Sequence, residues 1–299
     1  MLDKNINLKI EAAIGGRIDC IHKIGSGVNN AVYLIEIKGL NYALKIKERG
    51  IYDFFENESS ALKEMDGFIA PKLYLYDYSD LDNKFMLIEY IDGEPIKSVN
   101  EIGITKLAEL VNEIHEKTKR KNSATKNLKS DLKNYLDDKC YFNVHELEKI
   151  PFSKTQELIE TCDKAINFAE NYKYSDPENE VLIHGDLNVT NIIKDKSGKW
   201  RLIDWELSRY TQIETEIAAL IWAHCKNEKD IAELLNSELC GNGKKTIALM
   251  TLARGLDVST WRTKWINSLC ENKAKMDLYH SELEEDWSKI RILKTYLSD

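Results

Sequence analysis

Two short polar clusters, each joined to an apolar run, constrain this sequence more than any other feature. The first covers residues 183–193 and reads IHGDLNVTNII; the second covers residues 201–206 and reads RLIDWE. Short apolar runs bounded by Gly, Asp and Asn are typical of buried strands with polar residues at the strand ends. The intervening segment 195–199 predicts a tight turn. We therefore expect three polar side chains to meet at one end of a small β-structure: Asp186, Asn191 and Asp204.

The chemistry of these three side chains points to phosphoryl transfer. Two carboxylates and an amide oxygen are hard oxygen ligands of the kind Mg²⁺ prefers. A carboxylate that is not bound to the metal can orient a hydroxyl group and accept its proton. The alternative is a pair of polar turns beside buried strands. The Asn five residues after Asp186, and the later Ile203-Asp204 pair, favour the functional interpretation.

These motifs also resemble those of a known group of enzymes. His184-Gly185-Asp186, followed by Asn191 and then Ile203-Asp204-Trp205-Glu206, is similar to the catalytic and metal-binding motifs of the aminoglycoside phosphotransferase and choline kinase superfamily. The resemblance implies Asp186 as the catalytic base, Asn191 and Asp204 as Mg²⁺ ligands, and His184 as a structural orienter. It also implies an α+β, two-lobed, protein-kinase-like fold. We expect a nucleotide-binding lobe over residues 1–91, with an antiparallel sheet and one main helix, and a helical catalytic and substrate-binding lobe over residues 92–299.

Composition limits the class of protein. The 299 residues are 43% hydrophobic and 31% charged, which is typical of a soluble globular protein with enough chain for two lobes. The net charge of −8 argues against a general nucleic-acid binder and is compatible with a cationic substrate. Six cysteines without a CxxC pair favour free cytosolic thiols. We expect a cytoplasmic protein with no signal peptide, no membrane span and no obligatory protein partner.

Alternating apolar residues near the N-terminus predict strands over 18–24, 31–37 and 42–47. The loop 25–30 contains glycines, whose backbone N–H groups can approach phosphates closely. Lys45 and Lys47 project from the same face of the third strand. The resemblance favours Lys45 as the phosphate-binding lysine and implies a glycine-rich loop without its third glycine. Its nucleotide contacts would be Gly25, Ser26, Gly27, Asn29 and Asn30.

A helix over 52–66 follows, and its Glu56, Glu58 and Glu64 are candidates to pair with Lys45. The resemblance favours Glu58. Strands are predicted over 72–78 and 84–90, after which the resemblance implies a hinge between the lobes. Adenine would bond there to backbone groups of Glu89 and Ile91.

Beyond the hinge the apolar residues follow a helical period. Helices are predicted over 104–115, 131–142 and 153–173, with a turn at 176–178, and most of 229–297 is helical. His115 is interpreted as structural, and the tryptophans as core residues. Five carboxylates could line an amine site, although solvated helix faces are the default: Asp257, Glu282, Glu284, Glu285 and Asp286.

The resemblance therefore predicts a kinase that uses ATP, or alternatively GTP, with Mg²⁺ to phosphorylate a hydroxyl of a small, amine-bearing molecule. His-Gly-Asp is typical of the aminoglycoside branch, whereas Ile-Asp-Trp-Glu is more similar to choline, ethanolamine and thiamine kinases. Two alternatives stay open. One is a protein kinase, against which the missing activation-segment anchor argues; the other is a non-catalytic, spore-coat-type relative.

Overall fold

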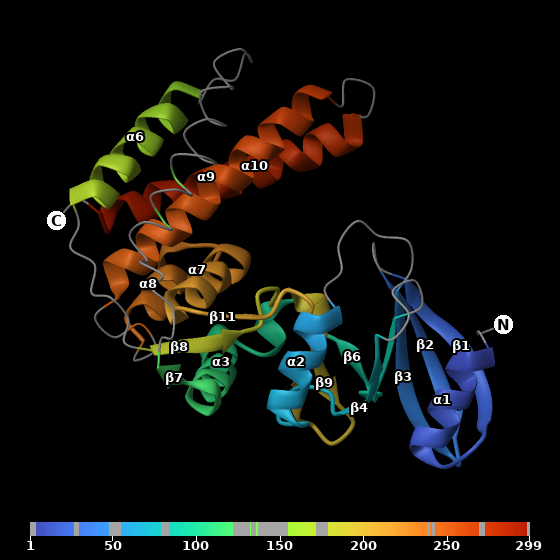
Figure 1. Ribbon diagram of the computed structural model, residues 1–299. Coiled ribbons are helices and arrows are strands. Elements are labelled where there is room, and N and C mark those ends of the chain that lie inside the picture. Colours follow the sequence, from blue (N-terminus) through green and yellow to red (C-terminus); the bar gives the residue numbers. More distant parts are fainter. Residues whose placement is uncertain are drawn as a thin grey trace. The chain divides into compact units, whose positions relative to one another are not determined.

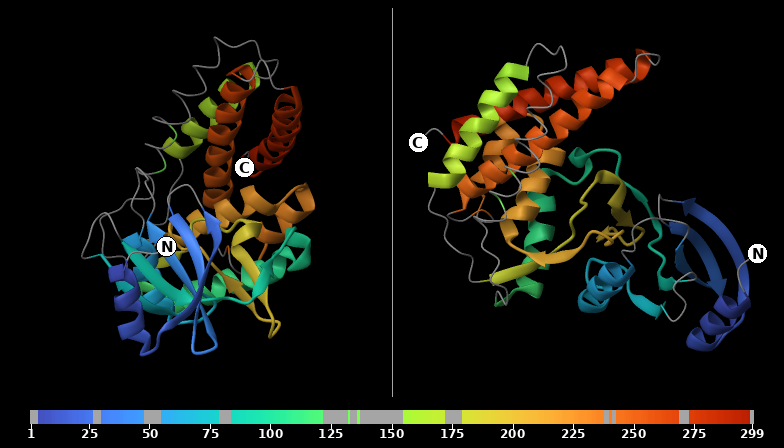
Figure 2. Two further views of the ribbon diagram at one scale, coloured as in Figure 1. Left: turned by 90° about the vertical axis from the view of Figure 1, so that its right-hand side faces the viewer. Right: turned by 45° about the horizontal axis from the view of Figure 1, so that its top comes forward.

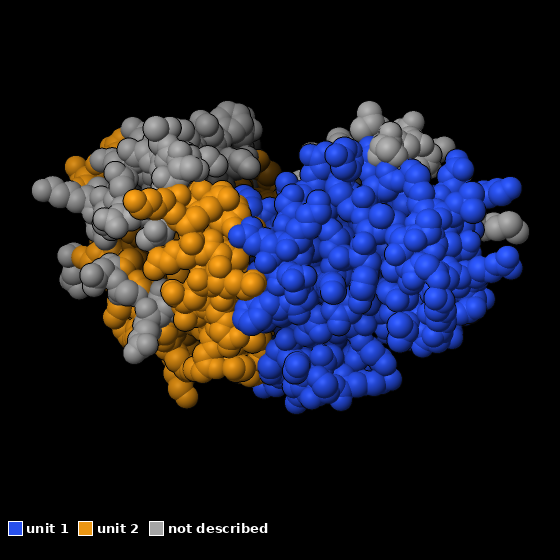
Figure 3. All heavy atoms as spheres, turned by 60° about the horizontal axis from the view of Figure 1, so that its bottom comes forward, with its two compact units in different colours: residues 1–101, 184–209 blue, residues 102–183, 210–299 orange. Residues whose placement is uncertain are grey.

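The computed structural model of the chain describes residues 4–26, 30–47, 55–78, 84–121, 132, 136, 155–171, 179–237, 240, 243–268 and 273–297 (Figures 1 and 2). The chain forms two compact units (Figure 3). Unit 1 comprises residues 1–101 and 184–209, and unit 2 comprises residues 102–183 and 210–299. The lobes expected at residues 1–91 and 92–299 divide the chain by function and not by compactness. The two compact units do not test this division, which stays a prediction.

Unit 1 is built on a five-stranded antiparallel sheet with the order β1-β2-β3-β5-β4. Hairpins join β1 to β2 and β2 to β3, and β5 inserts between β3 and β4. The apolar alternation of these segments gives each strand a buried face, so the predicted strands are confirmed. Their bounds are β1 Ile18–Ser26, β2 Asn30–Ile37, β3 Leu40–Lys47, β4 Leu73–Asp77 and β5 Phe85–Glu89.

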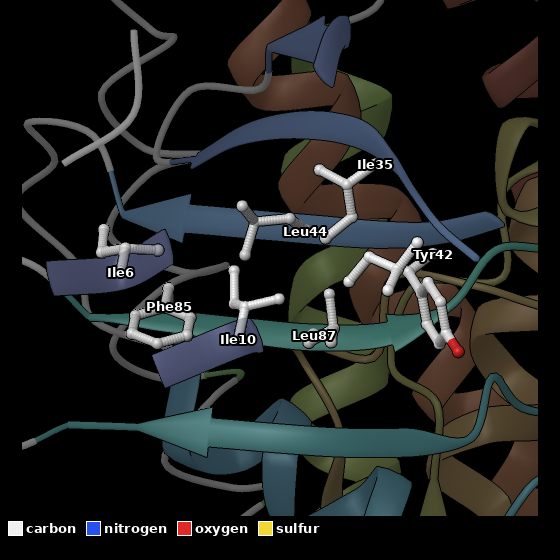
Figure 4. Packing of buried hydrophobic residues seen from close by; sticks show 8 residues of the cluster. Ile6, Ile10, Ile35, Tyr42, Leu44, Phe85 and Leu87 are labelled. Atoms are coloured by element: carbon white, nitrogen blue, oxygen red, sulfur yellow. The ribbon is translucent and has the colours of Figure 1, made fainter. Parts of the chain in front are cut away.

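One face of this sheet packs against helix α1, Lys4–Ile14, which sequence patterns did not predict. Ile6 and Ile10 of the helix are buried against Leu44, Phe85 and Leu87 of the central strands (Figure 4). Burying an aliphatic or aromatic side chain in this way stabilises the folded protein by roughly 1.5–3 kcal/mol per side chain. Ile6, Ile10 and Ile14 recur every fourth residue, which is a helical spacing, and these three side chains pack on the sheet.

Residues that alternate with this cluster point to the other face of the sheet. Leu44 faces α1, so the next residue, Lys45, projects on the side of helix α2, Phe55–Met65. The helix buries Leu62 and Met65, and it also buries Glu58. The two faces therefore differ: α1 covers an apolar face, and α2 brings a carboxylate to a lysine.

A second, small sheet in unit 1 carries the polar clusters. Strands β6 (Gly93–Pro95), β9 (Ile192–Asp195) and β10 (Trp200–Leu202) form it in the order β10-β9-β6. A Cβ atom on Gly93 would lie 2.4 Å from the Lys194 carbonyl, so only glycine permits this approach of β6 to β9. Short 3-10 turns occur at Val99–Glu101 and at Val189–Asn191, the latter directly before β9.

Unit 2 is mainly helical, and its buried side chains follow the predicted helical period. Helices α9 and α10 pack side by side, and α6 and α7 also contact α9 (Figure 2). A three-stranded sheet with the order β11-β8-β7 accompanies these helices. The elements are α3 Ile104–Thr118, β7 Arg120–Lys121, α6 Thr155–Asn171, β8 Asn179–Ile183, β11 Arg209–Thr211, α7 Ile213–His224, α8 Glu228–Leu235, α9 Lys244–Ser268 and α10 Lys273–Thr295.

The predicted α+β class is confirmed, with an antiparallel sheet early in the chain and helices later. The helix expected over 131–142, apart from residues 132 and 136, and the turn expected at 176–178 lie outside the described residues. None of the described helices has the length and apolar composition that crossing a bilayer requires. The four cysteines in the described part of the chain are free thiols.

Candidate active site

Lys45 lies at the centre of a buried ionic network in unit 1. Its Nζ donates to the two carboxylate oxygens of Glu58 at 2.9 and 2.6 Å, and to Oδ1 of Asp204 at 2.8 Å. The predicted contact between Lys45 and Glu58 is therefore present. Glu56, an alternative partner, instead lies 4.0 Å from the Lys84 ammonium.

The charge state of Lys45 follows from its neighbours. Burial by itself would lower the pKa of Lys45, but the carboxylates of Glu58 and Asp204 outweigh this effect and raise it. The side chain is almost fully buried, so its positive charge is held in a fixed place. A fixed buried cation of this kind suits a polyanionic ligand such as the phosphates of a nucleotide.

The HGD turn depends on its glycine. Gly185 has φ +83°, and a Cβ atom there would lie 2.4 Å from the Leu207 carbonyl oxygen. Any other residue would be strained and would collide with that backbone. The turn places Asp186 where both its carboxylate oxygens accept hydrogen bonds from amides, Oδ1 from Asn188 and Oδ2 from Asn191 at 3.0 Å. Asp186 is therefore held in one orientation.

His184 connects the two polar clusters. Its Nδ1 accepts from the Asp186 N–H at 3.3 Å, so Nε2 carries the proton and donates to the Ile203 carbonyl at 3.0 Å. Burial lowers the pKa of His184 to about 4, which keeps the ring neutral at physiological pH. The ring also packs on Trp205, with centroids 4.6 Å apart. This geometry fits the predicted structural role better than that of a general base.

Asn191 and Asp204 lie on adjoining segments, because the Ile203 N–H donates to the Asn191 carbonyl at 2.9 Å. The Asn191 amide nitrogen donates to Asp186, which leaves the amide oxygen for a cation. Asp204 has φ +65°, a left-handed conformation that is rare for a non-glycine residue. Strain of this kind is concentrated at functional sites.

These residues fit Mg²⁺ rather than a metal held by protein alone. In the described part of the chain, no three His, Cys, Asp or Glu side chains are placed so that they could hold a metal ion together. Mg²⁺ commonly uses one or two carboxylates together with substrate phosphates and water. The amide oxygen of Asn191 and the partly exposed carboxylate of Asp204 match that pattern.

Glu206 adds a further carboxylate to this network. Burial and the nearby Asp204 raise its pKa, and Asp186 contributes in the same direction. Its Oε2 also accepts from the Asn30 amide nitrogen at 3.4 Å. Sequence reasoning treated Glu206 only as a marker of the enzyme branch, because nothing local shows that it faces Lys45 and Asp186.

The predicted nucleotide contacts are only partly described. Gly25 and Ser26 end strand β1, where they pair with β2, whereas Gly27 and Asn29 lie outside the described residues. Asn30 is buried, and its Oδ1 accepts no hydrogen bond within the described residues. An orphaned buried acceptor beside the glycine-rich loop is suited to a ligand donor.

The two hinge residues differ in their free backbone groups. The Glu89 N–H already donates to the Lys72 carbonyl at 2.8 Å, which leaves its carbonyl as the candidate adenine acceptor. The Ile91 N–H donates to no acceptor in the part of the chain that the structure describes.

Neither Trp205 nor the paired carboxylates of α10 fit an amine site. Trp205 is fully buried and donates its indole N–H to the Leu202 carbonyl at 2.8 Å, so it has no free face for a quaternary amine. On α10, Glu282 and Asp286 pair with Arg262, and Glu285 pairs with Lys289 at 3.1 Å. These three carboxylates therefore already have cationic partners within the chain, and only that of Asp286 is buried.

Sequence reasoning also missed Arg201. Its side chain is largely buried and binds Glu89 with two hydrogen bonds. An arginine beside two apolar residues carries no signal for a partner more than a hundred residues earlier in the chain.

Comparison with known proteins bears on the family and the fold of the chain. The sequence matches the phosphotransferase enzyme family over residues 21–241. A search of curated protein sequences found no match.

Solved structures share the fold. A choline kinase, LicA from Streptococcus pneumoniae, superposes with a TM-score of 0.57 at 17% identity, covering 99% of this chain and 98% of that one. An aminoglycoside phosphotransferase from Alicyclobacillus acidocaldarius gives a TM-score of 0.64 at 14% identity, with 96% and 94% covered. A thermostable mutant of aminoglycoside phosphotransferase APH(4)-Ia, in a ternary complex with ADP and hygromycin B, gives 0.61 at 13% identity, with 97% and 99% covered. At these identities the likeness is one of fold.

Proposed function

Because the chain belongs to the phosphotransferase enzyme family and is a small-molecule kinase, we propose that it transfers the γ-phosphate of ATP to a hydroxyl of an amine-bearing acceptor. One observation carries this proposal. In unit 1, Lys45 contacts both Glu58 and Asp204 within 2.9 Å, while Asn191 fixes the carboxylate of Asp186. The same unit thus holds a buried cation, two hard oxygen ligands and an oriented carboxylate.

Each residue has a role that follows from its surroundings. Asp186 orients the acceptor hydroxyl and takes its proton as the oxygen bonds to the γ-phosphorus and the bond to the β-phosphate oxygen breaks. Lys45, held by Glu58, binds the phosphates. Because phosphoryl transfer needs little covalent help, positioning and charge neutralisation supply most of the rate enhancement.

Asn191 and Asp204 would hold Mg²⁺, which when bound neutralises phosphate charge. The loop from Gly25 to Asn30 would cover the phosphates. The Glu89 carbonyl and the Ile91 N–H would receive the adenine edge. The Ile91 N–H has no acceptor among the described residues, which supports this assignment. We propose ATP as the phosphate donor and GTP as the alternative.

The acceptor class rests on charge and on the family. The chain carries a net charge of −8, and unit 1 places Glu206 close to Asp186 and Asp204. An anionic site attracts a cationic acceptor. We propose an amino sugar or an amino alcohol. We do not assign its amine to Glu282, Glu285 or Asp286 of α10, because these three carboxylates are already paired within the chain.

The test is ADP release in the presence of Mg²⁺ and ATP, with acceptors presented one at a time. The panel contains kanamycin- and gentamicin-type aminoglycosides, choline, ethanolamine, thiamine, homoserine and methylthioribose. Acceleration by one acceptor, lost in Asp186→Ala and retained in the exposed helix variant Asp163→Ala, would support the proposal. Failure of the protein to bind ATP or GTP with Mg²⁺ would contradict it.

A further inference from the structure

Arg201 makes an unusually complete set of contacts for a residue outside the predicted site. Its Nη1 and Nη2 donate to the two carboxylate oxygens of Glu89, at 3.2 and 2.6 Å. Nη2 also donates to the Ala70 carbonyl at 2.9 Å, and Nε donates to the Ile69 carbonyl at 3.2 Å. Four of the five guanidinium N–H groups therefore have acceptors, which a lysine could not reproduce.

These acceptors belong to segments that are distant in sequence. Ile69 and Ala70 follow helix α2, which carries Glu58, and Glu89 ends strand β5. The Ile69 carbonyl also accepts from the Leu202 N–H at 2.9 Å, so backbone and side chain of β10 bind the same loop. Ile69 itself has φ +51°, an unfavourable conformation that these bonds help to hold.

Glu89 is fixed from two sides. Besides binding Arg201, its Oε2 accepts from the Lys72 N–H at 3.1 Å, and its own N–H donates to the Lys72 carbonyl. The Arg201 side chain is only 12% exposed and that of Glu89 is 32% exposed, so the pair is mostly shielded from water. A bidentate pair in such surroundings has a defined geometry, unlike a solvated surface ion pair.

The positions of these two residues along the chain give the arrangement its functional meaning. Glu89 lies two residues before Ile91, the proposed adenine donor. Arg201 lies three residues before Asp204, the proposed metal ligand, and the loop that it binds follows the helix that carries Glu58. The Arg201 side chain thus connects the proposed hinge to the loop that follows α2, and it lies on the segment that leads to Asp204.

We infer that Arg201 is a positioning residue that, through Glu89 and the Ile69–Ala70 carbonyls, sets the placement of the adenine-binding hinge relative to Asp204. This inference rests on the proposed nucleotide-binding function. Arg201 touches neither nucleotide nor acceptor; it acts by fixing the segments that do. Loss of residues that support a site in this way typically costs about 10- to 100-fold in affinity or activity.

The experiment measures binding of Mg·ATP and of Mg·triphosphate by calorimetry, without an acceptor. Triphosphate has no base, so it does not use the hinge. The variants are Arg201→Met, Arg201→Lys and Glu89→Met, with Arg17→Met as the matched control. Arg17 is exposed and its side chain contacts nothing else among the described residues. Circular dichroism and thermal unfolding establish the folded fraction of each variant.

We expect Arg201→Met to weaken both ligands, by about 10- to 100-fold for ATP. Glu89→Met should weaken ATP but leave triphosphate within about twofold, because Arg201 still binds the Ile69 and Ala70 carbonyls. Arg201→Lys should fall between wild type and Arg201→Met, and Arg17→Met should bind as wild type does. If Arg201→Met does not fold, Arg201→Lys and Glu89→Met still decide the matter.

Two results would overturn the inference. The first is that folded Arg201→Met binds ATP within about twofold of wild type and only its unfolding temperature falls. If Arg201→Met does not fold, the same result for Arg201→Lys would count. The other is Glu89→Met losing ATP and triphosphate affinity equally. A wild-type protein that binds neither ATP nor GTP would instead contradict the proposed function, so the two failures are distinguishable.

Discussion

Each unit of the protein contains a buried ionic network, and the two networks are balanced differently. In unit 1, the single cation Lys45 faces Glu58 and Asp204, and Glu206 lies close by. In unit 2, Arg262 pairs with Glu282 and Asp286 between α9 and α10. A second cation there, Lys289, pairs with Glu285 and donates to the Trp222 carbonyl at 3.0 Å.

The difference separates a site from a structural connection. Carboxylates in excess of nearby cations are costly to bury, and binding a cation relieves that cost. Carboxylates that already have arginine and lysine partners need no further cation. Breaking such a pair leaves a buried charge without compensation. We therefore propose that the network of unit 1 binds Mg²⁺ and phosphate, whereas the network of unit 2 connects helices α9 and α10.

The strongest test of this contrast removes the carboxylates of unit 1. Asp186→Ala should lower kcat by about 10²- to 10⁴-fold, because a positioned base typically contributes that much. Asp204→Ala should also abolish measurable turnover, through loss of a metal ligand. Both variants should keep their fold, since neither carboxylate belongs to the hydrophobic core and Glu58 still pairs with Lys45 when Asp204 is removed. Steady-state kinetics and circular dichroism measure the two effects, with Asp163→Ala as control; near-normal turnover in either variant would contradict the mechanism.

Breaking the network of unit 2 should affect stability instead. Arg262→Met leaves buried Asp286 without its guanidinium and should lower the free energy of unfolding by about 3–5 kcal/mol. The double variant with Asp286→Leu should recover part of that loss. Urea unfolding measures both, and Arg254→Met, an exposed site on the same helix, is the matched control. Loss of ATP affinity in folded Arg262→Met would show that this network is part of the site.

The two buried histidines extend the comparison to pH. Burial lowers the pKa of His184 in unit 1 and of His115 in unit 2 to about 4, from an ordinary value of 6.5. A histidine whose folded pKa is depressed stabilises the protein above pH 6.5, and this stability is lost as the pH falls toward 4. Each ring should contribute about 3 kcal/mol, which urea unfolding at pH 7 and pH 4.5 would detect.

Substituting each histidine by leucine distinguishes the role of His115 from that of His184. Neither ring nitrogen of His115 has a hydrogen-bond partner within the described residues, whereas both nitrogens of His184 do. His115→Leu should therefore reduce the acid sensitivity without loss of kcat, because it removes a titrating group that fixes no other described residue, and burying an unpaired polar group costs free energy. His184→Leu should lower kcat by freeing the Asp186 turn from Ile203. Equal kinetic effects of the two substitutions would refute this distinction.

The smallest expected effect concerns Glu206. Its pKa is raised in the folded protein, so the fold favours the protonated form, and that preference is lost as the pH rises through the folded pKa. Glu206→Gln should stabilise the protein at pH 7 by less than about 1 kcal/mol, because solvent screens a partly exposed group. The gain should vanish below pH 4.5, the ordinary value. Thermal unfolding at both pH values measures it, and Glu285→Gln in unit 2 should shift stability the opposite way.

Several features of the site were determined by local sequence. The HGD turn, Asn191 and the Ile203-Asp204 pair were predicted as one cluster because strand-end polar residues follow short apolar runs. The positive φ of Gly185 and the adjoining Leu207 carbonyl give the reason for the glycine. The strands of the main sheet were predicted too, since period-2 alternation reflects the side of the sheet that each residue faces.

Other features were decided only by the tertiary structure. Three glutamates on α2 were candidates for Lys45, and the orientation of the helix on the sheet brought Glu58 to it. The carboxylates of α10 were interpreted as a possible amine site or solvated faces, but Arg262 and Lys289 neutralise three of them. Arg201 reaches partners 112 to 132 residues away.

The physical reason is the range of the interactions. Turn conformation, strand alternation and helical period depend on neighbours within a few residues, so the sequence alone determined the HGD turn and the sheet. Burial and charge pairing depend on which segments meet after the chain has folded. Whether a carboxylate shares one cation with another carboxylate, as Asp204 shares Lys45 with Glu58, or pairs with an arginine, as Asp286 does, is therefore a property of the tertiary structure.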